Sequence, residues 1–330
     1  MQIEGKNIIV TGGQGFIGST LVNGLIKYKP KKIVIVDNMF IYDQGGFKHG
    51  WLMQEPDIET IVGDAGDYPL MESIIRSMGE VDFVFNLAVM PLPHSLEHPI
   101  ENFNNNVQIV TTLLSFLKTR RIKRLIHFSS SEVYGSCQTS PMDETHPYAP
   151  STPYAASKLA GDQLVLSYAK SYRLPAVIIR PFNNYGPFQN DGSYAGIIPR
   201  TIKRLIEGKD VEIFGDGTQT RDYVFVEDTV RAAILIAIHF EEIEGMIFNV
   251  ASGKEVEIGY LVKKIREIYM SMAPFAEGRE IVYCPARPMD VHRHIGSGYL
   301  IEDTLGFKPQ IDINNGLYNT VQWYIGKVIE

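Results

Sequence analysis

Tyr154 and Lys158 form the pair of residues whose types and spacing could most directly do chemistry. They stand four positions apart at the start of segment 153–172, whose apolar residues have helical spacing. Side chains at positions i and i+4 share one face of a helix, so this spacing places an ammonium group beside a phenol. A phenol, with a pKa of about 10, is a poor base at neutral pH, and nearby positive charge favours the phenolate. The pair therefore predicts a general base that accepts the proton of a hydroxyl group.

Three serines and a glutamate precede this pair in the chain. Ser129, Ser130, Ser131 and Glu132 come directly after an apolar run at 124–128. Ligands bind at the carboxyl ends of strands in open α/β sheets, and we expect Ser130 to hydrogen-bond the substrate hydroxyl there. A polar loop and a solvated helix pair would explain either motif alone. Their occurrence together, in this order and behind a glycine-rich turn, favours a catalytic site.

The elements that must position these residues alternate regularly in the first half of the chain. Short runs rich in isoleucine and valine have the near-continuous apolar character of strands covered on both faces. Longer segments with helical spacing separate them, which predicts an α/β fold with a Rossmann-type, doubly wound parallel sheet and right-handed crossovers. The apolar runs are 7–11, 33–37, 59–62, 82–86, 124–128 and 176–180, and the helical segments are 17–28, 68–78, 100–119 and 153–172.

A glycine-rich turn joins the first predicted strand to the first predicted helix. Gly12, Gly15 and Gly18 stand in the sequence TGGQGFIGS. Glycines at these positions allow a tight turn, a close approach of a pyrophosphate to backbone N–H groups, and close packing of helix on strand. A glycine triplet alone is a weak signal, but its place between a strand and a helix predicts a dinucleotide site that includes Phe16 and Ile17.

Asp37 ends the second predicted strand and is followed by Asn38. A carboxylate at this position accepts hydrogen bonds from the adenosine ribose and repels a 2′-phosphate, so we expect NAD rather than NADP as the cofactor. A simple turn at these two residues is the alternative, and the upstream glycines favour the cofactor role. The remaining predicted cofactor contacts follow later strands or belong to the catalytic set: Asp64, Ala65, Leu87, Ala88, Asn106, Ser129, Tyr154 and Lys158.

The second half of the chain is richer in glycine and proline and alternates less regularly. We expect residues 1–181 to form the dinucleotide-binding domain and residues 182–330 to form mainly a smaller, loop-rich substrate lobe. Predicted strands near 212–214, 223–226 and 247–250 are interleaved with predicted helices near 194–207, 227–240 and 256–271. The chain therefore returns to the first domain at about 215–250.

The composition excludes several other classes of protein. Lys and Arg total 31 against 38 for Asp and Glu, a net charge of −7 with no basic stripe for nucleic acid. No apolar stretch approaches the roughly 20 residues of a membrane span and no leader-like segment opens the sequence, so we expect a cytoplasmic protein without membrane contact. The two cysteines, Cys137 and Cys284, have no zinc-type spacing, and we expect neither a disulfide nor a metal.

Motifs along nearly the whole chain resemble the extended short-chain dehydrogenase/reductase family, specifically its nucleotide-sugar epimerases, dehydratases and decarboxylases. The resemblance is carried by TGGQGFIGS, VDN, GD, NLA, SSSEVYG, STPYAASK, RPFNNYGP, GDGTQTRDYVFVEDTV and RPMDV, in this order. It implies an NAD-dependent enzyme that oxidises the 4-hydroxyl of a sugar carried on a nucleoside diphosphate.

The resemblance also implies substrate contacts that spacing alone does not predict. Asn183 looks like the family's substrate-contacting asparagine, and Phe182 would lie by the nicotinamide. Arg221 and Arg287 look like clamps on the diphosphate, a role that suits the bidentate guanidinium group. Phe214 would lie near the nucleotide base. A surface ion pair between Arg221 and Asp222 is the alternative for that arginine.

Glu132 bears on the reaction that follows oxidation. Similar 4,6-dehydratases and UDP-glucuronate decarboxylases carry a glutamate at this position, where it can remove the proton next to a new 4-ketone. Ser131 replaces the aspartate that most dTDP-glucose dehydratases have, so Glu132 would both deprotonate and protonate. His94, in a loop that borders the sugar in the family, could assist, although a lone loop histidine is more often simply solvated.

We therefore expect a nucleoside-diphosphate-hexose 4,6-dehydratase. The alternatives are a UDP-glucuronate decarboxylase or a nucleotide-sugar 4-epimerase and, more remotely, a non-catalytic dinucleotide sensor, since a Rossmann fold alone does not imply turnover.

Similar proteins commonly form homodimers through two helices of each subunit, and we expect the same here. Segments 100–119 and 153–172 would supply these helices. Their apolar residues could face a partner or the sheet, and periodicity does not separate the two. The residues in question are Leu113, Leu114, Phe116, Leu117, Leu164 and Leu166.

Overall fold

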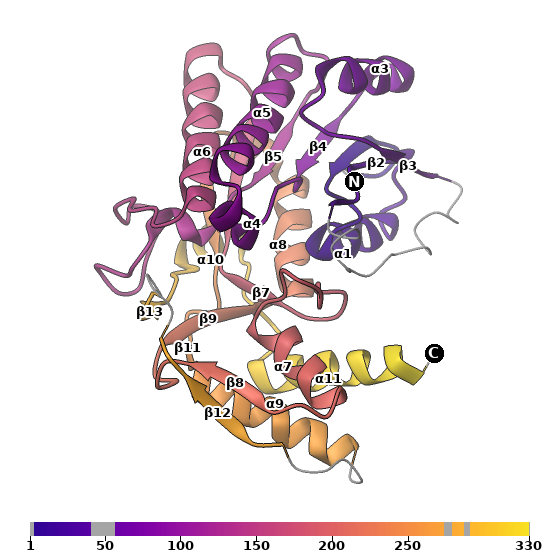
Figure 1. Ribbon diagram of the computed structural model, residues 1–330. Helices are drawn as coiled ribbons and strands as arrows, with labels where there is room; N and C mark the ends of the chain where they lie inside the picture. Colours follow the sequence, from indigo (N-terminus) through magenta and orange to yellow (C-terminus); the bar gives the residue numbers. More distant parts are fainter. Residues whose placement is uncertain (1–2, 41–56, 274–278, 287–290, 330) are drawn as a thin grey trace.

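A seven-stranded, entirely parallel sheet forms the centre of the computed structural model, which describes residues 3–40, 57–273, 279–286 and 291–329. The strand order is β10-β6-β5-β4-β1-β2-β3, and Figure 1 labels β2, β3, β4 and β5 of this sheet. The predicted Rossmann-type doubly wound sheet is therefore confirmed. The strands are β1 (Asn7–Thr11), β2 (Lys32–Asp37), β3 (Ile58–Val62), β4 (Phe83–Asn86), β5 (Leu125–Phe128), β6 (Ala176–Pro181) and β10 (Ile247–Val250).

Helices cover both faces of this sheet and bury its two apolar surfaces. On one face, α1 (Phe16–Ile26) and α8 (Val226–Ile238) enclose a core that α10 (Tyr299–Leu305) completes through Ile301. On the other face, α3 (Tyr68–Met78), α5 (Pro99–Lys118) and α6 (Pro153–Tyr172) enclose a second core. Continuous apolar strands need cover on both sides, which explains the two layers of helices.

Local signals fix where two of these helices begin. The Asp67 side chain accepts a hydrogen bond from the backbone N–H of Leu70 at the start of α3. The Thr152 hydroxyl accepts one from the N–H of Ala155 at the start of α6, and Pro153 occupies the first turn. Such caps satisfy backbone donors that have no partner within the helix.

A third core lies outside the central sheet. It is enclosed by α7 (Ile197–Ile206), α9 (Ile258–Met272) and α11 (Ile313–Ile329). Strand β9 (Thr220–Phe225) pairs with β7 (Asn183–Tyr185), β11 (Glu255–Glu257) and β13 (Arg293–His294), and β8 (Val211–Phe214) pairs with β12 (Ile281–Cys284). Between these elements the chain returns to the central sheet for α8 and β10 (Figure 1).

Two short helical segments lie close to the carboxyl edge of the central sheet. Helix α4 (Leu92–Glu97) follows β4 and leads directly into α5, and a 3₁₀ turn at Ser131–Tyr134 follows β5. Another 3₁₀ turn, Phe240–Glu242, follows α8. Within the described ranges, no helix combines the length and the apolar character needed to cross a bilayer.

The apolar residues that could have formed a dimer surface on α5 face the sheet instead. Leu113, Leu114, Phe116 and Leu117 are fully buried in the second core, which corrects the interpretation that they offer apolar surface to a partner. They serve as the inner face of α5 because the strands beneath need cover on that side. Leu164 and Leu166 on α6 are half-buried against the same core.

Candidate active site

A cavity of about 660 Å³ lies between the carboxyl edge of the central sheet and the third core. It brings together residues that are far apart in the sequence, because the parallel strands all end at the same edge. Predicted site residues that line it are Gly12, Gly15, Phe16, Ile17, Gly18, Asp37, Asn38, Asp64, Ala65, Leu87, Ala88, Ser129, Ser130, Ser131, Glu132, Tyr154, Lys158, Phe182, Asn183, Phe214 and Arg221.

The glycine-rich turn has the geometry of an anion cradle. Gly12 has a φ of +69°, and a Cβ atom built on it would lie 2.7 Å from the backbone nitrogen of Ala88. A Cβ on Gly18 would lie 2.1 Å from the carbonyl oxygen of Gly12. Helix α1 begins with Gly15 as its cap, so no side chain occupies its N-terminus at the cavity wall. This cradle fits the pyrophosphate of a dinucleotide.

Two carboxylates that follow the neighbouring strands β2 and β3 line the cavity beside this turn. Asp37, at the end of β2, accepts hydrogen bonds from the N–H groups of Gln14 (3.0 Å) and Met39 (2.9 Å). Its partial burial raises the pKa of the carboxyl, against the lowering effect of these backbone donors. Asp64, after β3, accepts a hydrogen bond from Asn105 at 2.8 Å. The residues therefore fit a dinucleotide whose adenosine ribose reaches the end of β2.

Tyr154 and Lys158 lie on the first two turns of α6 and face the cavity together with Ser130. A hydrogen bond joins the Ser130 side chain to the Tyr154 phenol. Burial raises the pKa of Tyr154 to about 12, the Ser130 hydrogen bond opposes this, and the nearby Glu132 charge adds to it. Burial lowers the pKa of Lys158 to about 8, opposed by Asp162.

The position of the Lys158 ammonium refines the sequence prediction. Its Nζ donates a hydrogen bond to the backbone carbonyl of Phe128 at the end of β5. Burial and the Glu132 charge raise the pKa of Tyr154 in the protein alone, whereas the predicted phenolate depends on nearby positive charge that lowers this pKa. An oxidised nicotinamide beside the phenol would supply positive charge that opposes this shift.

Glu132 lies in the 3₁₀ turn after β5 and lines the cavity on the same side as Tyr154. Its backbone N–H donates to the Ser130 hydroxyl at 3.2 Å, so the turn holds both side chains in one short segment. The other carboxylates among the described lining residues, Asp37 and Asp64, follow β2 and β3 on the opposite side of β4 and β1. Of the described carboxylates that line the cavity, Glu132 is therefore the one that lies near Tyr154.

A buried polar network lies behind the catalytic face of α6. Asp162, one turn after Lys158, accepts a hydrogen bond from the Arg180 guanidinium at 2.9 Å. Arg180 also donates to the hydroxyls of Tyr134 (2.8 Å) and Tyr148 (3.0 Å). Asp162 and Arg180 are completely buried, so a break in this pair would leave a buried charge without compensation. The network fixes α6 against β6 and the 3₁₀ turn.

The opposite wall of the cavity comes from the lobe around the third core. Asn183 donates from its side-chain amide to the carbonyl of Asp222 at 3.2 Å. The Arg221 guanidinium donates to backbone carbonyls of Thr220 and Val291 while also lining the cavity. The Arg200 guanidinium lies 5.1 Å from the centre of the Phe214 ring. This wall offers aromatic surface and positive charge together.

Two of the described residues that were predicted for the site, Asn106 and His94, do not line the cavity. Asn106 lies behind the wall, where it accepts from the Met90 N–H (2.8 Å) and donates to Ser157 (2.9 Å), and so ties α5 to α6. His94 is buried in α4 and does not line the cavity. Arg287 lies outside the described residues.

Several lining residues were not predicted from the sequence. Phe40 and Tyr194 stack with ring centres 6.1 Å apart, and α4 adds Leu92 and Pro93. Arg200 also lines the cavity, from α7. No periodicity in the sequence indicated that Phe40 and Tyr194 meet beside the proline-rich segment MPLPHSLEHP.

Comparison with known proteins gives one consistent family. The profile described as the NAD dependent epimerase/dehydratase family matches residues 8–251. A dTDP-glucose 4,6-dehydratase of Neisseria gonorrhoeae is 32% identical over 98% of this chain and 97% of that protein. A UDP-N-acetyl-alpha-D-glucosaminuronate decarboxylase of Bacillus cytotoxicus is 33% identical over 97% of this chain and 98% of the relative.

A solved structure extends the comparison to a third reaction. The UDP-glucose 4-epimerase of Thermotoga maritima, determined with UDP-glucose, has a TM-score of 0.86 at 29% identity, covering 98% of this chain and all of that one (100%). The names span a dehydratase, a decarboxylase and an epimerase. They therefore support a family of nucleotide-sugar enzymes and leave the individual reaction open.

Proposed function

This chain belongs to the NAD-dependent epimerase/dehydratase family, and we propose that it is a nucleoside-diphosphate-hexose 4,6-dehydratase. It is an NAD-dependent enzyme, as the family and its relatives show. The narrower proposal rests on the position of Glu132. Its carboxylate lines the same cavity wall as Tyr154, close enough for its charge to raise the pKa of the phenol. A base for the hydroxyl and a base for the neighbouring carbon are what dehydration requires.

Tyr154 begins the reaction by accepting the proton of the sugar 4-hydroxyl. Ser130, which is hydrogen-bonded to the phenol, orients that hydroxyl, and Lys158 holds a positive charge on the same helical face. Gly12, Gly15 and Gly18 would hold the pyrophosphate, and Asp37 the adenosine ribose. The bound NAD supplies a hydride acceptor at the start and the hydride donor at the end.

Glu132 performs the elimination from the 4-keto sugar. The ketone makes the proton on carbon 5 acidic, and the Glu132 carboxylate removes it. The same carboxyl group then donates that proton to the 6-hydroxyl, which leaves as water while the double bond between carbons 5 and 6 forms. Tyr154 then gives carbon 5 the proton that it took from the 4-hydroxyl, and the hydride that NAD would return to carbon 6 would complete a 4-keto-6-deoxy sugar with no net use of NAD. One carboxyl group suffices because it changes protonation state between the two steps.

Substrate recognition would come from the opposite wall. Arg221 suits the diphosphate through its planar guanidinium group, and Phe214, backed by Arg200, suits stacking against a nucleobase. Asn183 would contact the sugar. The hexose would then lie between Asn183 and Glu132, where the two walls face each other.

A mass-resolved incubation tests the proposal. The purified enzyme is incubated with UDP-, GDP-, CDP- and dTDP-hexoses and hexuronates, and the products are weighed. We expect loss of water from one of the neutral hexoses. Loss of carbon dioxide from a hexuronate would replace the proposal with a decarboxylase, and unchanged mass with a new sugar would replace it with an epimerase.

Substitution of Glu132 separates elimination from oxidation. In Glu132→Gln we expect no dehydrated product, while the absorbance of reduced nicotinamide still rises after addition of sugar. Glu302→Gln, a half-exposed carboxylate on α10, is the control and should dehydrate as the parent does. Normal dehydration by Glu132→Gln would contradict the assigned role.

We also propose a homodimer, through the outer surfaces of α5 and α6. Ile100 and Phe103 on α5 and Tyr172 on α6 are exposed, in contrast to the buried inner residues of α5. Light scattering of the parent and of Ile100→Glu tests this: we expect a dimer that weakens with the added charge. A monomeric parent would contradict the proposal.

A further inference from the structure

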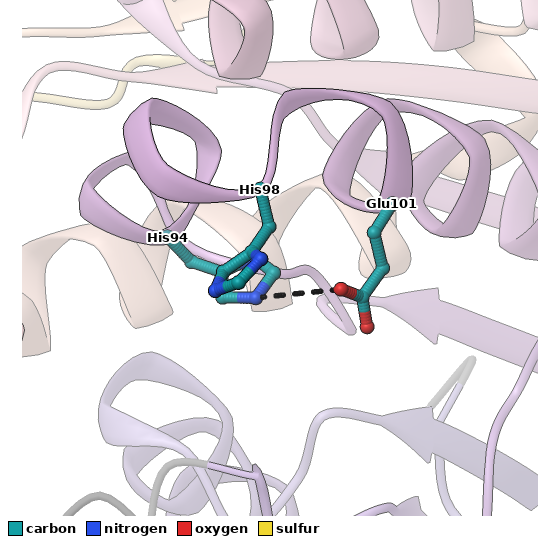
Figure 2. A group of neighbouring side chains, drawn as sticks. All are labelled: His94, His98 and Glu101. Carbon is teal, nitrogen blue, oxygen red and sulfur yellow. Dashed lines mark ion pairs between the residues drawn. The ribbon is translucent and has the colours of Figure 1, made fainter.

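His94, His98 and Glu101 form a cluster at the junction of α4 and α5, outside the cavity lining (Figure 2). His94 belongs to α4, His98 lies between the helices, and Glu101 lies in the first turn of α5. The His98 N–H donates to the His94 carbonyl at 2.8 Å, and the Asn102 N–H donates to the His98 carbonyl at 3.0 Å. This helical bonding across the junction places residues four and three positions apart on one face.

One ligand atom from each side chain lies within 4.8 Å of the others. In a tetrahedral zinc site, metal–ligand distances of about 2.0–2.2 Å place ligand atoms roughly 3.3–3.5 Å apart. His98 and Glu101 are exposed and can make this adjustment by side-chain rotation alone. Two imidazoles and one carboxylate are ligands that suit borderline divalent cations.

The His94 ring is the observation that points to a ligand. It is only 4% exposed, and its Nδ1 atom makes no hydrogen bond within the part of the chain that the structure describes. Its Nε2 atom lies 4.0 Å from the Glu101 carboxylate, which is longer than a hydrogen bond. A buried ring nitrogen without a hydrogen-bond partner is costly, and a ligand bound to the ring is one of the few arrangements that reduces this cost.

The surroundings hold that ring in place. Phe40 and Tyr194 contact it edge to face, with ring centres 5.1 and 6.3 Å away. A ring held by these contacts is a preorganised ligand, because it loses little rotational freedom on binding.

We propose that His94, His98 and Glu101 bind one divalent transition-metal ion of the zinc, cobalt or nickel class. Three protein ligands leave at least one coordination position for water. The spacing of the two cysteines predicted no metal, and His94 was expected to assist at the sugar, with a solvated side chain as the alternative. The bound ion ties α4 to α5 beside Phe40 and Tyr194, which also form the cavity wall.

Cobalt titration of the metal-free, full-length protein tests the site directly. The visible absorption of the protein after addition of CoCl₂ reports the coordination geometry of the bound cobalt ion. Calorimetric titration with ZnCl₂ reports the affinity of the protein for zinc and the number of ions bound per chain. We expect one ion per chain with saturable binding, and at least about tenfold weaker binding in His98→Gln and in Glu101→Gln. Both residues are exposed, so these substitutions leave the core unchanged.

A second histidine–glutamate pair supplies the matched control. His239 Nδ1 lies 3.6 Å from Glu242 Oε1 on the surface, and the described residues add no third ligand there. His239→Gln should bind cobalt as the parent does. Zinc should also raise the Tm of the parent and of His239→Gln more than that of His98→Gln.

Absence of saturable binding, or equal binding by the parent and by His98→Gln, overturns the proposal. The measurements use no nucleotide sugar, so their outcome is independent of the dehydratase assignment.

Discussion

The two ends of the cavity are built in different ways. At the dinucleotide end, the backbone defines the site: Gly12 and Gly18 leave no room for a Cβ atom, and the remaining contacts follow strand ends. At the end proposed for the nucleotide sugar, called the sugar end below, side chains such as Phe214, Arg200 and Tyr194 define the wall on the nucleotide side, and they come from separate elements of the lobe. The difference predicts that the first end tolerates almost no change, whereas the second can be altered to change the substrate.

Tyr154→Phe should have the largest effect because it acts where both ends meet. Removal of the hydroxyl deletes the general base, so we expect kcat to fall by about 10³-fold. NAD and sugar affinities should stay close to those of the parent. Steady-state turnover and NAD binding, measured on the same preparation, check this. A loss of less than tenfold would mean that another group accepts the proton.

Gly18→Ala tests how strict the backbone-defined end is. The new Cβ would lie 2.1 Å from the Gly12 carbonyl and 2.8 Å from the Gly13 Cα, which are backbone atoms that cannot rotate away. Overpacking of this kind costs about 2–3 kcal/mol, so we expect NAD affinity to fall by about 100-fold. Calorimetric titration with NAD measures it.

Gly24→Ala, on the same helix, is the matched control. Its Cβ would meet only side-chain methyl groups of Ile234 and Val230, each at 2.9 Å, and these can shift. We expect a small effect on NAD affinity. Equal losses in the two variants would show that helix α1 as a whole, rather than the turn, is sensitive.

The contrast between the two ends also explains what the sequence could predict. Segments 68–78 and 153–172 were predicted from apolar spacing and match the observed bounds of α3 and α6, which begin at the N-caps Asp67 and Thr152. The parallel sheet, the glycine turn and the NAD cofactor followed from the same kind of local pattern. Such features depend on residues that are close in the chain.

The remaining features depend on contacts between distant segments. Phe40 and Tyr194 meet only after the lobe folds over α4, and no periodicity records that contact. The inward direction of Leu113 and Leu117 depends on which side of α5 the sheet occupies. The pKa of Tyr154 is raised by burial, an effect that the local spacing to Lys158 does not record.

Asp37→Asn should have an intermediate effect at the dinucleotide end. Loss of a charged acceptor for the ribose hydroxyls corresponds to about tenfold weaker NAD binding, and the discrimination against NADP should diminish. The pKa of Asp37 is raised by burial, so as pH falls its carboxylate is protonated earlier than an ordinary one. NAD affinity of the parent should therefore decline at a higher pH than an ordinary aspartate would give, whereas Asp37→Asn should lack this decline. Titrations from neutral to mildly acidic pH compare the two, and parallel curves would exclude Asp37 as the titrating contact.

Phe214→Ala should have the smallest effect, because the sugar end relies on several side chains rather than one. The ring offers a stacking surface backed by Arg200, a contact worth about 1 kcal/mol, so we expect KM to rise about fivefold with kcat unchanged. Tyr283→Ala on the paired strand β12 is the control, since that exposed ring does not line the cavity. A change in kcat rather than KM would place Phe214 near the reacting carbon of the sugar and not near the nucleobase. The lobe would then contribute to the chemical step as well as to substrate binding.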